Sequence, residues 1–152
     1  MARVHFTVRK HLPLPARSVY DELVDWRGHA EWVPMTRVVM ESGDGGVGTT
    51  FVATTGLGPL ALPDRMRVEE MDSADMTVRI VKIGPVLTGD VVLAVHPAGE
   101  ESCDLLWDED VTVPVLPQFL AGPVGAVARI AFGVSIDAMA KRVRGRLLAR
   151  AA

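Results

Sequence analysis

Apolar and polar residues alternate along most of the first hundred positions, with one exception near the N-terminus. In the stretch 4–12, Val4, Phe6 and Val8 alternate with polar residues, which predicts a half-buried strand. Residues 15–25 instead repeat apolar side chains at helical spacing, and residues 28–32 predict a second, shorter helical turn. This helical excursion carries two of the three tryptophans, Trp26 and Trp32. The pattern therefore predicts two short helices between strands.

The chain after this excursion reads as a series of strands. Clusters of Gly, Pro and Asp recur at short intervals and separate segments rich in β-branched or alternating apolar residues. The predicted strands cover residues 37–41, 49–55, 60–71, 76–83, 88–96 and 103–113. Strands that follow one another this closely are typical of an antiparallel meander.

Residues 123–149 predict one long closing helix. Its expected apolar stripe consists of Val124, Val127, Ala131, Val134, Ala138 and Arg142. A helix with a broad apolar face needs a sheet to bury that face. Small residues on the side that should face the sheet suit either close packing or room for a ligand. Basic residues crowd the last third, which suits the negative end of the helix dipole.

Composition narrows the function classes. With 152 residues the chain is expected to form one domain, 1–152, and a net charge of −3 speaks against a nucleic-acid partner. The lone Cys103 excludes an internal disulfide, and the four histidines have no metal-ligand spacing, so we expect no metal and no cofactor. No segment approaches the roughly 20 apolar residues of a membrane span. We expect a cytoplasmic protein, either a monomer or a homodimer.

Several short motifs resemble those of a known superfamily. They are LPLPA at 12–16, VYDEL at 19–23, DW at 25–26, WVP at 32–34 and GT at 48–49. With the element order, they resemble the START/Bet v 1-like (SRPBCC) superfamily, in its bacterial polyketide cyclase/dehydrase and lipid-transport-like branch. The resemblance implies an α+β helix-grip fold. In that fold a curved antiparallel sheet of about seven strands (β-α-α-β6-α) wraps around the long C-terminal helix and encloses a ligand cavity.

Charged residues on inward parities are the candidates for chemistry. Glu109 shares the parity of Trp107, so its carboxylate should face the apolar interior, where it could act as a general acid or base. Alternatively, Glu109 is solvated at the strand end or pairs with an arginine. Asp64 also has inward parity, but the neighbouring Pro63 can mark a bulge that reverses it, and we favour a structural role. Arg142 could form an ion pair with an inward acid. We favour the alternative, in which its aliphatic chain packs on the sheet and its guanidinium group reaches water.

The expected cavity lining follows from the same parities together with the resemblance. The candidate ligand-binding residues are Tyr20, Trp32, Phe51, Met66, Val78, Leu93, Leu105, Trp107, Ala131, Ser135 and Met139. Glu109 is the candidate catalytic residue. Methionines in such a lining suit irregular gaps, although ordinary core packing explains at least some of them.

Three functions are compatible with this picture. The first is binding or transport of a small hydrophobic molecule, such as a lipid, a polyketide or an aromatic compound. The second is a polyketide cyclase or dehydratase that uses inward acids, and the third is a protein-interaction module. An enzyme should bring at least two polar groups together deep in the cavity. The sequence offers Glu109 and, with less support, Asp64, Tyr20, Thr55 and Arg142, so binding is favoured.

Overall fold

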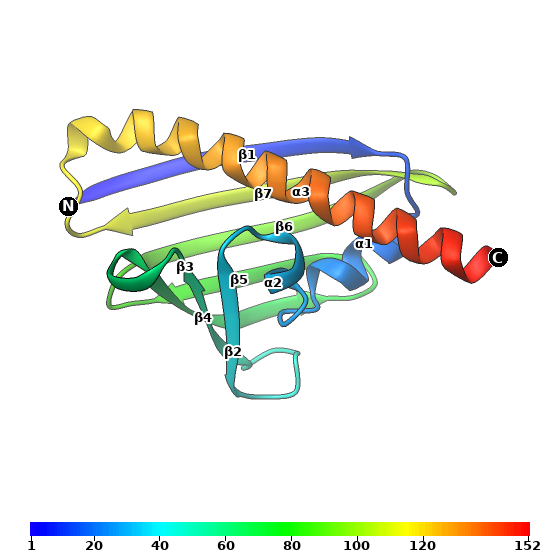
Figure 1. The fold of residues 1–152 in the computed structure, drawn as a ribbon, viewed down its shortest axis with the longest axis horizontal. Coiled ribbons are helices and arrows are strands. Elements are labelled where there is room, and N and C mark those ends of the chain that lie inside the picture. Colours follow the sequence, from blue (N-terminus) through cyan, green and yellow to red (C-terminus); the bar gives the residue numbers. More distant parts are fainter.

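Seven antiparallel strands form one sheet in the computed structural model, which describes residues 1–152 (Figure 1). The strands are β1 (Ala2–Leu12), β2 (Thr36–Ser42), β3 (Thr50–Thr55), β4 (Leu62–Asp72), β5 (Thr77–Ile83), β6 (Thr88–Gly99) and β7 (Ser102–Val113). The helices are α1 (Ala16–Leu23), α2 (His29–Trp32) and α3 (Ala121–Ala151). The predicted order of elements is confirmed, and the predicted bounds differ from the observed ones by a few residues at the element ends.

The sheet order is β1-β7-β6-β5-β4-β3-β2, so strands β2 to β7 form a meander. The first strand pairs with the last one, with Val4 opposite Val111 and Leu12 opposite Cys103. As a result α1 and α2 connect the two opposite edges of the sheet. Figure 1 shows α3 running along β1, with α1 beneath its C-terminal half. This is the α+β helix-grip arrangement that the sequence predicts.

One face of the sheet provides the core. Along β7 the buried residues alternate with outward ones, and the buried set is Cys103, Leu105, Trp107, Glu109 and Val111. The inward parity predicted for this strand is therefore confirmed. The helical excursion is tied to the same core, because Val19 and Leu23 of α1 are fully buried. Burial of an aliphatic side chain of this size contributes about 1.5–3 kcal/mol.

Trp26 fixes the segment between α1 and α2. Its ring stacks on Phe51 of β3 with ring centroids 5.2 Å apart, and its Nε1 donates a hydrogen bond to the Gly45 carbonyl at 2.8 Å. The excursion is thereby attached both to the sheet and to the loop between β2 and β3. Phe51 also lines the cavity described below, so Trp26 supports one cavity wall from behind.

The valine stripe predicted for α3 is not the face that packs, although small residues face the sheet as expected. The stripe residues Val127 and Val134 are 67% and 57% exposed, whereas Gly125, Ile136 and Met139 are buried. Both faces of the N-terminal half of α3 are apolar, so hydrophobic periodicity cannot decide which one packs. Close approach decides it: a Cβ at Gly125 would lie 3.3 Å from the His5 carbonyl oxygen of β1. The small-residue face therefore meets the sheet.

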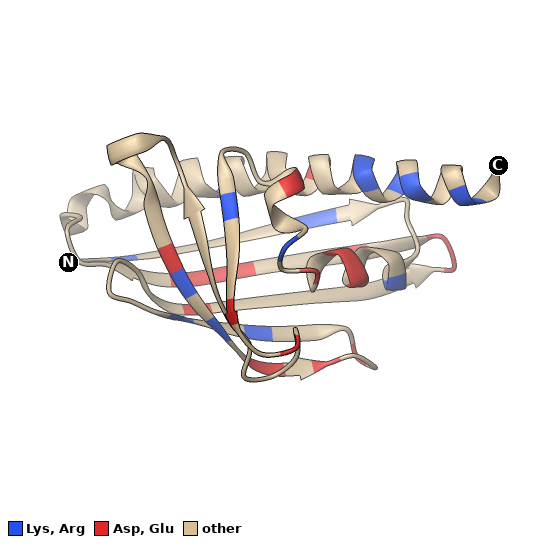
Figure 2. Ribbon diagram, turned by 60° about the horizontal axis from the view of Figure 1, so that its bottom comes forward, with Lys and Arg blue, Asp and Glu red and all other residues tan.

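By length and composition, the segment Gln118–Ala151 could cross a membrane, which the sequence analysis did not expect. The core helix of a soluble protein passes the same test, and here the buried face of α3 packs against β1 and α1. Its Lys and Arg residues gather toward the C-terminal end, as the ribbon in Figure 2 shows.

Two of these arginines bind a buried acid of α1. Arg142 Nε donates to Glu22 Oε1 at 3.0 Å, and Arg146 pairs with Glu22 Oε2. The Glu22 side chain is only 1% exposed. The expectation of a solvated Arg142 head was therefore wrong, because a carboxylate buried between α1 and α3 needs a compensating charge. This ion pair holds the helical excursion against the long helix.

Candidate functional site

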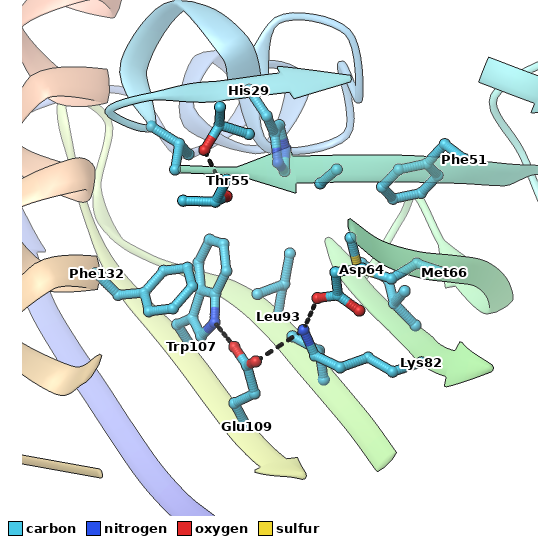
Figure 3. A pocket seen from close by; sticks show the side chains of 15 residues that line it. His29, Phe51, Thr55, Asp64, Met66, Lys82, Leu93, Trp107, Glu109 and Phe132 are labelled. Atoms are coloured by element: carbon cyan, nitrogen blue, oxygen red, sulfur yellow. Dashed lines mark hydrogen bonds and ion pairs between the residues drawn. The ribbon is translucent and has the colours of Figure 1, made fainter. Parts of the chain in front are cut away.

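A cavity of about 90 Å³ lies between the inner face of the sheet, α2 and α3 (Figure 3). Strands β3 to β7 supply most of its wall, α2 and the following turn supply His29 and Val33, and α3 supplies Phe132. The apolar lining residues are Val33, Phe51, Ala53, Met66, Ile80, Val91, Leu93, Trp107 and Phe132. The polar ones are His29, Thr36, Thr55, Asp64, Lys82 and Glu109. The cavity is thus mostly apolar, with its polar groups concentrated in a few places.

Three charged side chains meet in this cavity, and we call them the Asp64–Lys82–Glu109 cluster. Lys82 Nζ forms ion pairs with Asp64 Oδ2 and, at 2.9 Å, with Glu109 Oε1. Trp107 Nε1 donates a hydrogen bond to Glu109 Oε2 at 3.0 Å. The Lys82 and Glu109 side chains are each 5% exposed, and that of Asp64 is 14% exposed. Figure 3 shows the three groups converging from separate strands.

Strand register explains how the cluster forms. Asp64, Lys82 and Glu109 occupy inward positions of β4, β5 and β7. In the strand between β5 and β7, the residue paired with Lys82 is Gly89, which shares the inward parity of the buried Val91. Gly89 has a φ of 139°, and a Cβ there would lie 2.2 Å from the Asp110 carbonyl oxygen. No side chain therefore stands between the Lys82 stem and β7.

The two carboxylates keep the lysine charged. Burial alone would lower the pKa of Lys82, but the neighbouring Glu109 and Asp64 outweigh burial and raise this pKa above its ordinary value. Burial raises the pKa of Asp64, and the charge of Lys82 opposes that rise only in part. With every member ionised the cluster carries one net negative charge. Asp64 is consequently the member poised to take up a proton.

Asp64 also carries an unused hydrogen-bonding atom. Two buried side-chain atoms lack a partner, Trp32 Nε1 and Asp64 Oδ1, and only Asp64 lines the cavity. A buried polar atom without a partner costs about 1–3 kcal/mol. A proton on this oxygen, or a ligand that donates to it, would remove that cost. Asp64 Oδ1 is therefore the atom through which the cavity can recognise a polar group.

His29 stands across the cavity from the cluster (Figure 3). Its Nε2 donates a hydrogen bond to the Leu23 carbonyl at 2.7 Å, so the Nδ1 of the neutral ring carries no proton. Burial lowers the pKa of His29, and its ring lies between Trp26 and Trp32 at centroid distances of 5.6 and 4.6 Å. We therefore treat His29 as a neutral ring that offers only an acceptor to the cavity.

The structure brings together some of the residues expected from the sequence. Phe51, Met66, Leu93 and Trp107 line the cavity together with Glu109. The other candidates lie outside the lining, namely Tyr20, Trp32, Val78, Leu105, Ala131, Ser135 and Met139. Six of these are buried in the packed core, and Ala131 is exposed. Close packing of α1 and of the middle of α3 against the sheet fills the space that they were expected to border.

Two findings on the charged residues go beyond the expectations. The register Thr54–Pro63 and Ala53–Asp64 runs on without a shift, so Pro63 marks no bulge there and the inward parity of Asp64 holds, while its structural role stays a prediction. Lys82 was missed, although it continues the inward series of Val78 and Ile80 in β5. That periodicity was the available signal. The partner of Glu109 is this lysine rather than solvent or an arginine.

Residues 3–147 match the family described as polyketide cyclase/dehydrase and lipid transport. The chain belongs to this family. The match covers nearly the whole chain and confirms the resemblance to the SRPBCC/Bet v 1-like superfamily. A search of curated protein sequences finds no match.

Solved structures show the same fold. The Zhui aromatase/cyclase from Streptomyces sp. R1128 is 16% identical, with a TM-score of 0.79 and coverage of 95% of this chain and 96% of that one. Norcoclaurine synthase from Thalictrum flavum, in complex with dopamine and hydroxybenzaldehyde, is 18% identical, with a TM-score of 0.69 and coverage of 95% and 88%. Ara h 8.0201 is 15% identical, with a TM-score of 0.70 and coverage of 95% and 99%. At these identities the similarity establishes the fold.

The cluster predicts a pH-dependent loss of stability when its lysine is removed. In Lys82→Met, the buried Asp64 and Glu109 lose their counter-charge, and we expect the free energy of unfolding to fall by about 3–5 kcal/mol near neutral pH. Groups whose protonation is favoured in the folded state stabilise it at low pH and lose that effect as pH rises. The deficit should therefore shrink as pH falls toward the range where carboxyls protonate.

Urea unfolding of the wild type and the variant, measured across this pH range, checks the prediction. Lys10→Met is the matched control, because Lys10 forms a more exposed pair with Asp137 at 3.2 Å. Its effect should stay below about 1 kcal/mol. A Lys82→Met deficit that is no larger than the control, or that grows at low pH, would contradict the assignment.

Proposed function

We propose that this chain binds a small, mostly apolar ligand in the cavity between the sheet, α2 and α3. The observation that carries this proposal is the lining itself. Nine of the fifteen lining residues are hydrophobic, and the charged ones converge at a single cluster. Small-molecule sites combine an apolar wall with a few placed polar groups in this way. Membership of a family described by cyclase, dehydrase and lipid-transport activities supports the same proposal.

Cavity volume limits the size of the ligand. The volume is about 90 Å³, whereas one water occupies roughly 30 Å³ of liquid and an engineered cavity of roughly 150 Å³ binds benzene. The cavity is therefore smaller than one that holds benzene, and a single ring would enter if a wall residue such as Phe132 moved outward. A long polyketide or a two-chain lipid would require a much larger rearrangement. The two single-ring compounds bound to norcoclaurine synthase are of the favoured size.

Toluene is a suitable probe of the apolar wall. We expect it to bind the wild type saturably and to raise the melting temperature, because a ligand that binds only the folded state stabilises it. Ala53→Leu adds volume at a lining position of β3, and it should weaken toluene binding by at least about tenfold because an overfilled cavity resists the ring.

Chemical-shift changes in two-dimensional NMR spectra report the affinity. Ala98→Leu makes the same side-chain change at an exposed position of β6 and should leave toluene affinity unchanged. The proposal fails if toluene produces no saturable shifts in the wild type, or if the Ala53 and Ala98 variants behave alike while both remain folded.

The cluster also favours a second candidate, an enzyme of the cyclase or dehydratase type. Two acids and a lysine converge in an apolar cavity, which meets the requirement for more than one polar group. Burial raises the pKa of Asp64, and a carboxyl with a raised pKa suits the role of a general acid. In this reading the Glu109 carboxylate would remove the α-proton, and the electron pair of that C–H bond would form the new C=C bond. Asp64 would donate its proton to the hydroxyl, which leaves as water, and proton exchange with solvent would restore both acids.

A small β-hydroxy aryl ketone, followed by absorbance for loss of water, tests the enzyme candidate. If it holds, Asp64→Asn should lower turnover by roughly 100-fold or more, the usual contribution of a general acid, while toluene affinity stays nearly constant. Elimination that is no faster with the wild-type protein than in buffer would reject this candidate and leave the binding proposal standing.

A further inference from the structure

The charge balance of the cavity is uneven. Lys82 is the only Lys or Arg among the fifteen lining residues, and it faces two carboxylates, those of Asp64 and Glu109. The other titratable lining group, His29, is a neutral ring. The cavity wall therefore carries one uncompensated negative charge whenever both acids are ionised. An apolar surrounding strengthens the attraction of such a charge for a cation.

Hydrogen-bonding capacity in the cavity is uneven too. Glu109 uses one oxygen for Lys82 and the other for the Trp107 indole. The hydroxyls of Thr36 and Thr55 bond to each other at 2.7 Å. Asp64 Oδ1 is buried and has no partner. What the cavity lacks is a hydrogen-bond donor placed beside Asp64.

The cavity therefore has two deficits, an uncompensated negative charge and a missing hydrogen-bond donor, and ligand classes differ in whether they remove them. A carboxylate or phosphate brings negative charge and only acceptor atoms, so it would add to both deficits. A neutral hydroxyl donates one hydrogen bond but leaves the charge uncompensated. A protonated amine supplies both a donor and a positive charge, and its pairing with Asp64 would satisfy the unpartnered oxygen.

We infer that the cavity selects single-ring ligands that carry a protonated amine, with the ammonium group held by Asp64 Oδ1 and the ring against the apolar wall. This inference deepens the proposed function and rests on it. Asp64 is then the specificity-determining residue. Lys82 binds the other carboxylate oxygen of Asp64, and Glu109 supplies the second negative charge of the cluster.

Four ligands of nearly equal shape test the inference on the wild-type protein: benzylamine, benzyl alcohol, benzoate and toluene. Near pH 7 the amine is protonated, and we expect benzylamine to bind at least about tenfold more tightly than benzyl alcohol, since charge-assisted bonds are the stronger kind. Benzoate should bind most weakly. Equal affinities of amine and alcohol, or tighter binding of benzoate, would overturn the inference.

Variants locate the effect at one residue. Asp64→Asn keeps the side-chain size and removes the charge, so it should abolish the roughly tenfold preference for amine over alcohol. Asp90→Asn is the matched control, because Asp90 faces outward on β6 and pairs with Arg79. A preference that survives in Asp64→Asn would contradict the assigned residue.

Toluene binding distinguishes a failure of this inference from a failure of the proposed function. If toluene binds while benzylamine shows no preference, the inference falls and the proposed function stands. If none of the four ligands binds, both fall. The wild-type comparison needs no variant, so it decides the inference even if Asp64→Asn does not fold, which its melting curve would reveal.

Discussion

A lysine buried in an apolar interior must find compensating charge, and this requirement organises the candidate site. Desolvation of an ammonium group costs several kcal/mol, so Lys82 is tolerable only with acids in direct contact. The structure provides them from two other strands, Asp64 on β4 and Glu109 on β7. Because each partner belongs to a different strand, the ion pairs also depend on the register of the meander. The chemistry of the cavity and the order of the sheet are therefore coupled.

Two compensations of different kind stabilise the protein. Glu22 of α1 is buried and binds Arg142 and Arg146, and Arg142 also lies 3.9 Å from Glu31, so acids and arginines balance in this group. The Asp64–Lys82–Glu109 cluster has one more acid than base and retains an unpartnered oxygen. The first arrangement lies at a helix–helix contact and has its hydrogen bonds made. The second faces a cavity, where a ligand can complete it.

Periodicity predicted much of this, and its failures have identifiable causes. Inward parity correctly placed Glu109, and it placed Asp64 correctly as well despite Pro63. The same rule applied to Lys82, but a lysine within a strand is ordinarily taken as outward-facing. Periodicity could not predict which face of α3 is buried, because apolar residues such as Val127 lie on both sides of this helix. The close approach of Gly125 to β1 decides which face packs. Cavity size depends on how closely these elements pack, which no sequence pattern measures.

The most direct test of the account is the pKa of the Asp64 carboxyl, obtained from its carbon chemical shift in an NMR titration with Asp64→Asn used to assign the signal. A carboxyl that is buried in a negatively charged cluster and lacks a partner for one oxygen should titrate above its ordinary value of 3.8. A pKa at or below that value would mean that the charge of Lys82 outweighs both the burial of Asp64 and its closeness to Glu109. That result would contradict the account of Asp64 as an incompletely compensated carboxyl.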